Sequence, residues 1–275
     1  MPDVPVISLN NGTRLPQLGF GVFRVGDAEA VGVVGTALQE GYRSVDSAAG
    51  YENERGVGEA IARSGLPRGE VFVTTKLTNH AHGFDRALRA FDGSLELLGL
   101  DYVDLYLIHW PRPHHDLYVE TWRALEKIYA GGRAKAIGVS NFQIPHLQRL
   151  LDETDIVPAV NQIELHPYLT QPELRAFHAE HGIVTEAWSP LAKGGRLLAN
   201  PVVTTIAEKY ARTPAQIVLR WHIQLGNMVI PKSVTASRIR ENIDVFGFEL
   251  APDDVDAIAD LNTGHRTGPD PDTFG

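Results

Sequence analysis

Four ionisable side chains lie at or near the ends of short apolar runs in the first 110 residues of the chain. Asp46, Lys76 and His109 each close such a run, and Tyr51 follows Asp46 by five residues in a loop that contains glycine. If these runs are strands of a parallel barrel, the four groups share the edge at which such barrels hold their chemistry. Taken singly, they also fit a helix cap, its surface partner, a loop aromatic and a core histidine.

Together, the four side chains suit the reduction of a carbonyl group. A phenol with an ordinary pKa of about 10 exchanges protons poorly at neutral pH unless a nearby cation favours its ionised form. Lys76 supplies that cation, and Asp46 supplies the counter-charge that a buried lysine needs. A neutral His109 can donate a hydrogen bond to a carbonyl oxygen that becomes negative in the transition state. A hydride source is still required, which predicts a cofactor site.

The segment from Pro231 to Arg240 has the features of an anion site. It contains Lys232, Arg238 and Arg240 and no acidic residue, whereas the whole chain has 25 Lys plus Arg against 34 Asp plus Glu and a formal charge of −9. The segment leads from a predicted strand into a predicted helix, where free N–H groups and the positive helix end favour a phosphate. A solvated helix start is the alternative interpretation.

An aromatic side chain, an incomplete glycine motif and a pair of histidines are further candidates for binding a cofactor or a metal. Trp188 ends another apolar run and offers a flat face for stacking, although a core tryptophan fits equally. The nearest match to G-x-G-x-x-G, Gly56 to Ile61, lacks the third glycine and lies in a helical pattern, which indicates helix packing. His178 and His181 could share a helix face, but no third ligand is evident, so we expect an exposed pair and no metal.

The composition excludes several classes of protein. With 275 residues, of which 43% are hydrophobic, the chain can bury a substantial core, and we expect one domain over residues 1–275. The net negative charge opposes binding to nucleic acid or anionic membranes. The absence of cysteine excludes a disulfide scaffold and favours the cytoplasm. No segment approaches the roughly 18 apolar residues of a membrane span, and none has the pattern of a targeting signal.

Short apolar runs alternate with amphipathic segments, which predicts repeated βα units around a parallel sheet. The predicted strands are Phe20–Val22, Ser44–Asp46, Val71–Lys76, Val103–His109, Ala134–Ser140, Ala159–Ile163, Val184–Trp188 and Met228–Ile230. Helical faces are predicted for Leu88, Phe91, Leu95 and Leu98, and for Tyr118, Trp122, Leu125 and Tyr129. Eight such units match a (β/α)8 TIM barrel of about 250 residues, with a doubly wound sheet as the alternative.

Further segments are predicted outside the eight units. Val6–Leu9 and Arg14–Pro16, joined by Asn10-Asn11-Gly12, predict a β-hairpin that plugs the bottom of the barrel. Extra helices are predicted near Val203–Tyr210, from Pro214 after the cap residue Thr213, and from Pro252. The tail from Gly264 to Gly275 is rich in Gly, Pro and Asp and is predicted to be a loop.

With these residues in view, the sequence resembles the aldo-keto reductases from about Leu15 to Leu250. The segment Gly41–Glu54 is similar to the aspartate and tyrosine motif of that family, with Ser47 where threonine is usual, and Leu107–Pro111 matches its histidine strand. The resemblance implies a barrel with Asp46, Tyr51, Lys76 and His109 as catalytic residues. Trp188 is typical of bacterial members similar to 2,5-diketo-D-gluconate reductase.

The resemblance also implies an NADPH site. Ser140, Asn141 and Gln162 correspond to the groups that hold the nicotinamide carboxamide, and Trp188 corresponds to the residue that stacks on the ring. The segment from Ile230 to Asn242 resembles the site for the adenosine 2′-phosphate and adenine, which implies NADPH over NADH. The implied cofactor residues are Ser140, Asn141, Gln162, Trp188, Ser189, Leu191, Lys232, Ser233, Val234, Thr235, Arg238, Glu241 and Asn242.

For the substrate, we expect small aldehydes, ketones, dicarbonyls or keto sugars. The residues expected to line the mouth are Phe23, Ala49, His109 and Trp110, and the loop after His109 and the tail are short compared with those of steroid and aldose reductases. Without an exposed apolar stripe, we expect a monomer.

Two other functions remain open on the sequence alone. A cofactor-sensing partner protein, as in the potassium-channel β subunits that resemble this family, would present a large apolar docking surface. A hydrolase acting through Asp46 and Glu164 would leave Lys76, Trp188 and the basic segment without a role.

Overall fold

The computed structural model describes residues 4–274, in which the strands form two sheets. The larger sheet contains eight parallel strands in the order β10-β9-β8-β7-β6-β5-β4-β3, so that neighbours in the sheet are also consecutive in the chain. The strands are β3 (Phe20–Gly21), β4 (Ser44–Asp46), β5 (Phe72–Leu77), β6 (Val103–Ile108), β7 (Ala134–Ser140), β8 (Val160–Glu164), β9 (Val184–Trp188) and β10 (Met228–Val229). The predicted strands are confirmed, with limits that differ by about one residue.

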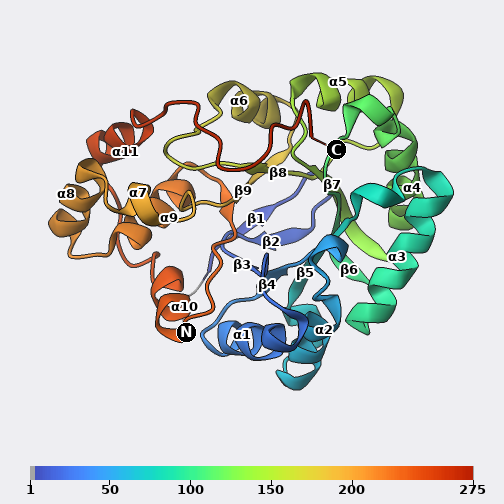
Figure 1. Cartoon of the computed structure of the whole chain (residues 1–275), viewed down its shortest axis with the longest axis horizontal. Coiled ribbons are helices and arrows are strands. Elements are labelled where there is room, and N and C mark those ends of the chain that lie inside the picture. The colour runs from blue at the N-terminus through green and yellow to red at the C-terminus, as the bar shows by residue number, and fades with distance from the viewer. Residues whose placement is uncertain (1–3, 275) are drawn as a thin grey trace.

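Helices surround this sheet, as Figure 1 shows. They are α1 (Asp27–Gln39), α2 (Glu54–Arg63), α3 (Phe84–Leu98), α4 (Tyr118–Ala130), α5 (Ile144–Glu153), α6 (Pro172–Glu180), α7 (Gly195–Leu198), α8 (Pro201–Tyr210), α9 (Pro214–Gln224), α10 (Ala236–Ile243) and α11 (Pro252–Ala259). The predicted extra helices correspond to α8, α9 and α11. Thr213 caps α9 as predicted, because its hydroxyl oxygen accepts from Gln216 N, while Thr213 N donates to Gln216 Oε1.

The first and last strands of the eight-strand order are joined by backbone hydrogen bonds. Gly19 N donates to Val229 O at 2.8 Å and Gly21 N donates to Pro231 O at 3.2 Å. The approach is close, since a Cβ on Gly19 would lie 2.8 Å from the terminal methyl of Met228. A side chain at position 19 would have to displace the end of the Met228 side chain, so glycine favours this close approach of the two strands.

The N-terminal segment forms the predicted antiparallel hairpin from β1 (Val6–Ser8) and β2 (Arg14–Pro16). Its turn residue Asn11 donates to Lys135 O at 2.9 Å, close to the start of β7. Leu15 is fully buried in a cluster of apolar side chains with Leu105 and Leu107 of β6. The hairpin thus packs against the edge at which the strands begin.

The helices pack on the outside of the sheet through the predicted apolar faces. Phe91, Leu95 and Leu98 of α3 and Trp122 of α4 are buried in the main core. A Cβ on Gly58 of α2 would lie 2.0 Å from Leu98 O, so this glycine allows α2 to approach α3. The interpretation of the glycine pair in α2 as helix packing is therefore confirmed.

The prediction of an exposed histidine pair is wrong, because His178 is buried and His181 is half-buried. His178 is 1% exposed, with Nδ1 2.9 Å from Thr185 Oγ1 and Nε2 2.9 Å from the side-chain amide nitrogen of Asn161. His181 stacks on Phe177 with ring centroids 4.2 Å apart. The face of α6 that carries His178 packs on the sheet, which the spacing of two histidines could not reveal. Within residues 4–274, no group of three metal-ligating side chains is found.

None of the helices in residues 4–274 is long and apolar enough to cross a membrane. The predicted C-terminal loop has no helix or strand after α11 as far as Phe274. Residues 1–3 and Gly275, which belong to the predicted domain and tail, lie outside the described residues.

Candidate active site

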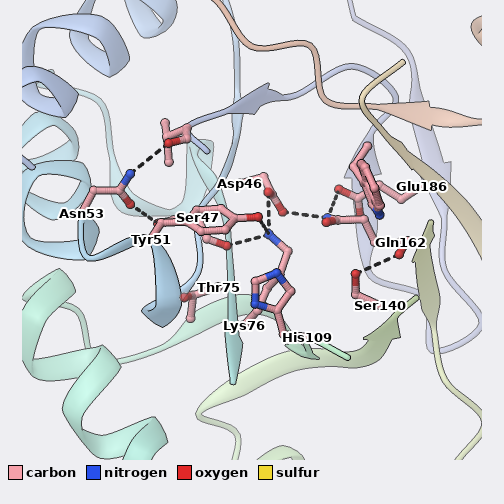
Figure 2. A network of polar contacts seen from close by, with 12 residues as sticks. Asp46, Ser47, Tyr51, Asn53, Thr75, Lys76, His109, Ser140, Gln162 and Glu186 are labelled. Atoms are coloured by element: carbon pink, nitrogen blue, oxygen red, sulfur yellow. Dashed lines mark hydrogen bonds and ion pairs between the residues drawn. The ribbon is translucent and has the colours of Figure 1, made fainter. Parts of the chain in front are cut away.

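Three adjacent strands bring the four predicted catalytic side chains together. Asp46 ends β4, Lys76 is the penultimate residue of β5, and His109 directly follows β6. Tyr51 ends a short 3-10 helix after β4. Figure 2 shows dashed lines from the Lys76 ammonium to the Asp46 carboxylate and to the Tyr51 hydroxyl.

Lys76 is the centre of this cluster. It is 0% exposed, and its Nζ donates to Asp46 Oδ1 at 2.6 Å, to Ser47 O at 2.8 Å and to Tyr51 Oη at 3.5 Å. Burial is the largest single influence and opposes the charged form, but the charge and hydrogen bond of Asp46, together with Tyr51 and Glu186, raise the pKa of Lys76 above its ordinary value. Lys76 is therefore a buried cation at neutral pH.

The pKa of Tyr51 is raised, whereas we expected from the sequence that a nearby cation would favour the ionised phenol. Burial raises the pKa of the phenol by more than the Lys76 cation lowers it, and Asp46 adds to the rise. The expected cation is present, but it moderates the rise and does not reverse it. Tyr51 is consequently protonated at neutral pH, which is the form that donates a proton.

A polar contact behind the tyrosine fixes its loop. Ser47 Oγ donates to Asn53 Oδ1 at 2.7 Å, and Asn53 Nδ2 donates to the backbone oxygens of Val22 and Val25 at 2.9 Å each. All of these side-chain atoms belong to buried residues. The loop that carries Tyr51 is thus tied to the segment after β3, which limits its movement relative to Lys76.

His109 is neutral in this environment. Burial and the nearby Lys76 cation lower the pKa of its imidazole to about 3. Its ring lies edge-on to the Tyr51 ring with centroids 5.5 Å apart. A neutral imidazole keeps one N–H, so His109 can donate one hydrogen bond to a substrate oxygen beside the phenol.

The strand ends beyond β6 carry a second set of polar groups in one connected network. Ser140 Oγ donates to Gln162 O at 2.8 Å, and Asn141 Nδ2 donates to His109 O at 2.9 Å and to Ser140 Oγ at 3.0 Å. Trp188 Nε1 donates to Asn141 Oδ1 at 2.8 Å. The predicted residues Ser140, Asn141, Gln162 and Trp188 are therefore neighbours, with Trp188 partly exposed.

Gln162 joins the two sets and reveals a residue that the sequence interpretation missed. Its Nε2 donates to Asp46 Oδ2 and to Glu186 Oε1, both at 2.8 Å. Glu186 lies in the middle of β9, two residues before Trp188 and therefore on the same face of the strand. An acidic residue inside an apolar run was the signal that could have identified it.

The basic segment lies at the start of α10. Lys232 and Arg238 are exposed and form no ion pair with any residue from 4 to 274, whereas Arg240 pairs with Glu40 at 2.6 Å. Of the three cations in this segment, Arg240 is thus the one with an ion-pair partner in the described residues. Glu241 accepts from Thr213 Oγ1 at 2.7 Å. The remaining two cations, beside the free N–H groups of a helix start, suit a phosphate.

The other predicted cofactor and substrate residues lie on the segments that follow the strands. Ser189 and Leu191 follow β9 and are half-buried. Ser233 and Asn242 are buried, whereas Val234 and Thr235 are exposed. Phe23 is 53% exposed and packs on Tyr51 with ring centroids 5.1 Å apart, and Ala49 is half-buried.

Trp110, predicted to line the mouth, is covered by the C-terminal tail. It is 8% exposed, and its ring centroid lies 4.5 Å from that of Phe274. Thr267 N and Gly268 N donate to the carboxylate of Glu164 at 2.6 Å and 3.1 Å. Figure 1 shows this tail crossing from α11 towards α5. The predicted substrate side of the site at Trp110 is thus more enclosed than we expected from the short length of the tail. The reason is that the Glu164 carboxylate holds the backbone of the tail in place.

Comparisons with known proteins agree with this geometry. The model of the Aldo/keto reductase family matches residues 17–263. The chain is 51% identical to "Methylglyoxal reductase DkgA" of Escherichia coli over 100% of both chains, and 51% identical to "Morphine 6-dehydrogenase" of Pseudomonas putida over 97% of this chain and 94% of that one. A crystal structure of a variant of Gox0644 in complex with NADPH is 49% identical, covers 99% of both chains and has a TM-score of 0.95.

Proposed function

We propose that this chain, which belongs to the aldo/keto reductase family, reduces the carbonyl group of small aldehydes, ketones, dicarbonyls or keto sugars to an alcohol with NADPH. It is an NADPH-dependent oxidoreductase. The observation that carries the proposed chemistry is the buried Lys76 ammonium, held between the Asp46 carboxylate and the Tyr51 hydroxyl, beside a neutral His109. A protonated phenol next to a cation suits proton donation to a developing alkoxide.

The fit of NADPH is supported by the donors that the chain presents. Lys232 and Arg238 have no ion-pair partner in the described part of the chain and can neutralise a phosphate. Gln162 keeps its amide oxygen for a ligand, because two carboxyl groups take its amide nitrogen. Trp188 is partly exposed at the end of the neighbouring strand, where it can stack on a ring.

We assign the cofactor groups to these residues accordingly. Lys232, Ser233, Val234, Thr235 and Arg238 would hold the 2′-phosphate, with Glu241 and Asn242 at the adenine. Ser140, Asn141 and Gln162 would hold the carboxamide and Trp188 the nicotinamide ring, and Ser189 and Leu191 complete the set. When bound, NADPH supplies the hydride that the carbonyl carbon receives.

The side chains of this protein then have distinct tasks. His109 donates a hydrogen bond to the carbonyl oxygen and orients the substrate. Tyr51 transfers its phenolic proton to the same oxygen as that oxygen gains negative charge. Lys76 stabilises the phenolate that remains, and Asp46 keeps Lys76 charged through the 2.6 Å ion pair. One proton and one hydride convert the carbonyl to an alcohol.

The scaffold that we propose is one closed (β/α)8 barrel over residues 1–275, with the hairpin as a plug at its base. Two features support it: the backbone hydrogen bonds between Gly19 and Val229 at the seam, and the burial of Leu15 of the hairpin among the side chains of β6. A closed barrel accounts for the meeting of eight strand ends around one site.

The partner-protein alternative gains no support from the surface. The large apolar side chains that are exposed within residues 4–274 are Val6, Phe23, Leu97 and Val234, which come from four different segments. A docking surface of several hundred square ångströms needs a contiguous set. The hydrolase alternative is also disfavoured, because the Glu164 carboxylate binds the tail.

The experiment that tests this function is a panel of carbonyl substrates with NADPH consumption as the readout. We expect methylglyoxal, glyceraldehyde and keto sugars to give a higher kcat/KM than bulky steroids. The partly buried mouth under Phe274 and Trp110 supports this order. A much higher kcat/KM for steroids would refute the proposed substrate class, and no NADPH consumption with any carbonyl would refute the reaction.

A further inference from the structure

The carboxyl group of Glu186 is joined to the proposed active site through Gln162. The proposed reaction assigns no task to this carboxyl group. Glu186 is 0% exposed in the middle of β9. Its Oε1 accepts from Gln162 Nε2 at 2.8 Å, and its Oε2 has no hydrogen-bond partner within residues 4–274. Burying a carboxyl group with one unpaired oxygen is unfavourable, because that oxygen loses its hydrogen bonds to water and gains none in return. A residue that weakens the core in this way has a reason beyond packing.

Gln162 is held by two carboxyl groups from opposite sides. Figure 2 shows its amide between Asp46 and Glu186, and both contacts involve the amide nitrogen at 2.8 Å. A primary amide has two N–H donors, so both are used. Rotating the amide by half a turn would place its oxygen against the carboxylate oxygen of Asp46, which has no proton to donate, and would remove the bond to Asp46. The orientation of the Gln162 amide is therefore fixed.

The fixed orientation decides what Gln162 can offer to a ligand. Only its oxygen remains, which is an acceptor. The neighbouring Asn141 already uses its amide nitrogen on His109 O and Ser140 Oγ, and its amide oxygen accepts from Trp188. Gln162 is thus the acceptor in this cluster that suits the N–H₂ group of a carboxamide.

We propose that Glu186 is a positioning residue of the reaction, which acts through Gln162: together with Asp46 it holds the Gln162 amide so that the amide oxygen receives the N–H₂ group of the nicotinamide carboxamide. This inference rests on the proposed function. It also links cofactor recognition to the ion pair of Asp46 with Lys76, because Gln162 bonds to the second oxygen of the same carboxylate.

The charge balance of the cluster is consistent with this role. Burial and the negative charge of Asp46 raise the pKa of Glu186 well above its ordinary value, although Lys76 and the bond from Gln162 lower it. A protonated Glu186 carries its proton on one oxygen and keeps the other as an acceptor for Gln162. Glu186 therefore orients the amide without placing a second negative charge beside Asp46 and Lys76.

Ligand binding to three variants tests the proposal. Glu186→Leu removes the acceptor, Glu186→Gln keeps one, and Thr185→Val alters the opposite face of the same strand as a control. The loss of one buried hydrogen bond predicts NADPH binding that is about fivefold to tenfold weaker in Glu186→Leu, measured by calorimetry. Binding of 2′,5′-ADP, which lacks the nicotinamide, should be unchanged. Glu186→Gln and Thr185→Val should bind NADPH within about twofold of wild type.

The outcomes separate the inference from the proposed function. Unchanged NADPH binding in Glu186→Leu, or equal weakening of NADPH and 2′,5′-ADP, would overturn the inference alone. Failure of the wild-type protein to bind NADPH would refute the proposed function and the inference with it. Binding and carbonyl reduction by wild type, with loss of NADPH affinity confined to Glu186→Leu, would support both.

A change in the ligand keeps the test valid if Glu186→Leu does not fold. The 3-acetylpyridine analogue of NADPH has a methyl group where the carboxamide has N–H₂, so it cannot donate to Gln162. Wild type and Glu186→Gln should both bind the analogue about fivefold to tenfold more weakly than NADPH. Equal affinity for the two ligands in both proteins would overturn the inference.

Discussion

Replacement of Tyr51 by phenylalanine removes the proposed proton donor and little else. The aromatic contacts of the ring with Phe23 and His109, at centroid separations of 5.1 Å and 5.5 Å, are compatible with phenylalanine. The hydroxyl contributes one hydrogen bond, at 3.5 Å from Lys76 Nζ, which is at the long limit for such a bond. We therefore expect the free energy of unfolding of Tyr51→Phe to change by less than about 1 kcal/mol.

The effect on the rate should be much larger. General acid catalysis contributes at least about 100-fold, which corresponds to about 2.7 kcal/mol of transition-state stabilisation. The kcat of Tyr51→Phe with methylglyoxal should fall by at least that factor, while its NADPH affinity stays close to that of wild type. The assay is NADPH consumption at saturating cofactor, with calorimetry for binding. Turnover close to that of wild type would refute the role of Tyr51.

Tyr106 provides a matched control for this experiment. Its hydroxyl in β6 is buried and has no hydrogen-bond partner within residues 4–274. Tyr106→Phe removes the same atom from a site outside the catalytic cluster, so kcat should be unchanged. The variant should be as stable as wild type or slightly more so, because an unpaired buried hydroxyl is unfavourable.

Three further perturbations follow from the surrounding structure. The double variant Lys232→Ala with Arg238→Ala should lower NADPH affinity by about tenfold or more and leave NADH affinity unchanged, because charge-assisted bonds to the 2′-phosphate are lost; equal affinities of wild type for both cofactors would contradict this assignment. In Gly268→Ala the new Cβ would lie 2.4 Å from Trp188 Cη2. An overpacking penalty of about 1–3 kcal/mol should displace the tail, so carboxypeptidase should digest it faster than in wild type, and an unchanged rate would refute the contact. Burial lowers the pKa of His178 to about 3, below its unfolded value of about 6.5, so the unfolded chain binds the extra proton and stability falls as pH drops through that window. By pH 5 His178 should contribute about 2 kcal/mol to this loss, so the loss measured by urea unfolding should be smaller by about that amount in His178→Gln; other buried histidines, such as His109, add their own contributions.

The residue pattern was sufficient to predict the positions of the strands and of the side chains that we propose to be catalytic. Strands such as Ala134–Ser140 are short, mostly apolar runs, here interrupted only by Lys135, that end at a polar residue, so the local sequence predicts their limits. Asp46, Lys76 and His109 follow from the same pattern, because parallel strands bring their carboxyl ends to one edge. These features depend on local sequence and a general property of parallel sheets.

The remaining features depend on contacts between distant segments. The tail meets the site because Glu164 accepts hydrogen bonds from Thr267 and Gly268, more than 100 positions later in the chain. The pKa of Tyr51 is set by a balance between burial and Lys76, and residue types alone do not give the extent of burial. The contact between Gln162 and Glu186 likewise depends on the register of β8 against β9, which the residue patterns of the two strands do not predict.

Transfer of isotope from the cofactor to the product tests the proposed reaction most directly. NADPH deuterated at C4 of the nicotinamide, on the face that reacts, is incubated with methylglyoxal and the wild-type protein, and the alcohol is analysed by mass spectrometry and NMR. Direct hydride transfer predicts one deuterium on the former carbonyl carbon of every product molecule, with the hydroxyl proton derived from Tyr51 and solvent. Alcohol that forms without deuterium at that carbon, or NADPH oxidation without alcohol, would contradict carbonyl reduction at this site.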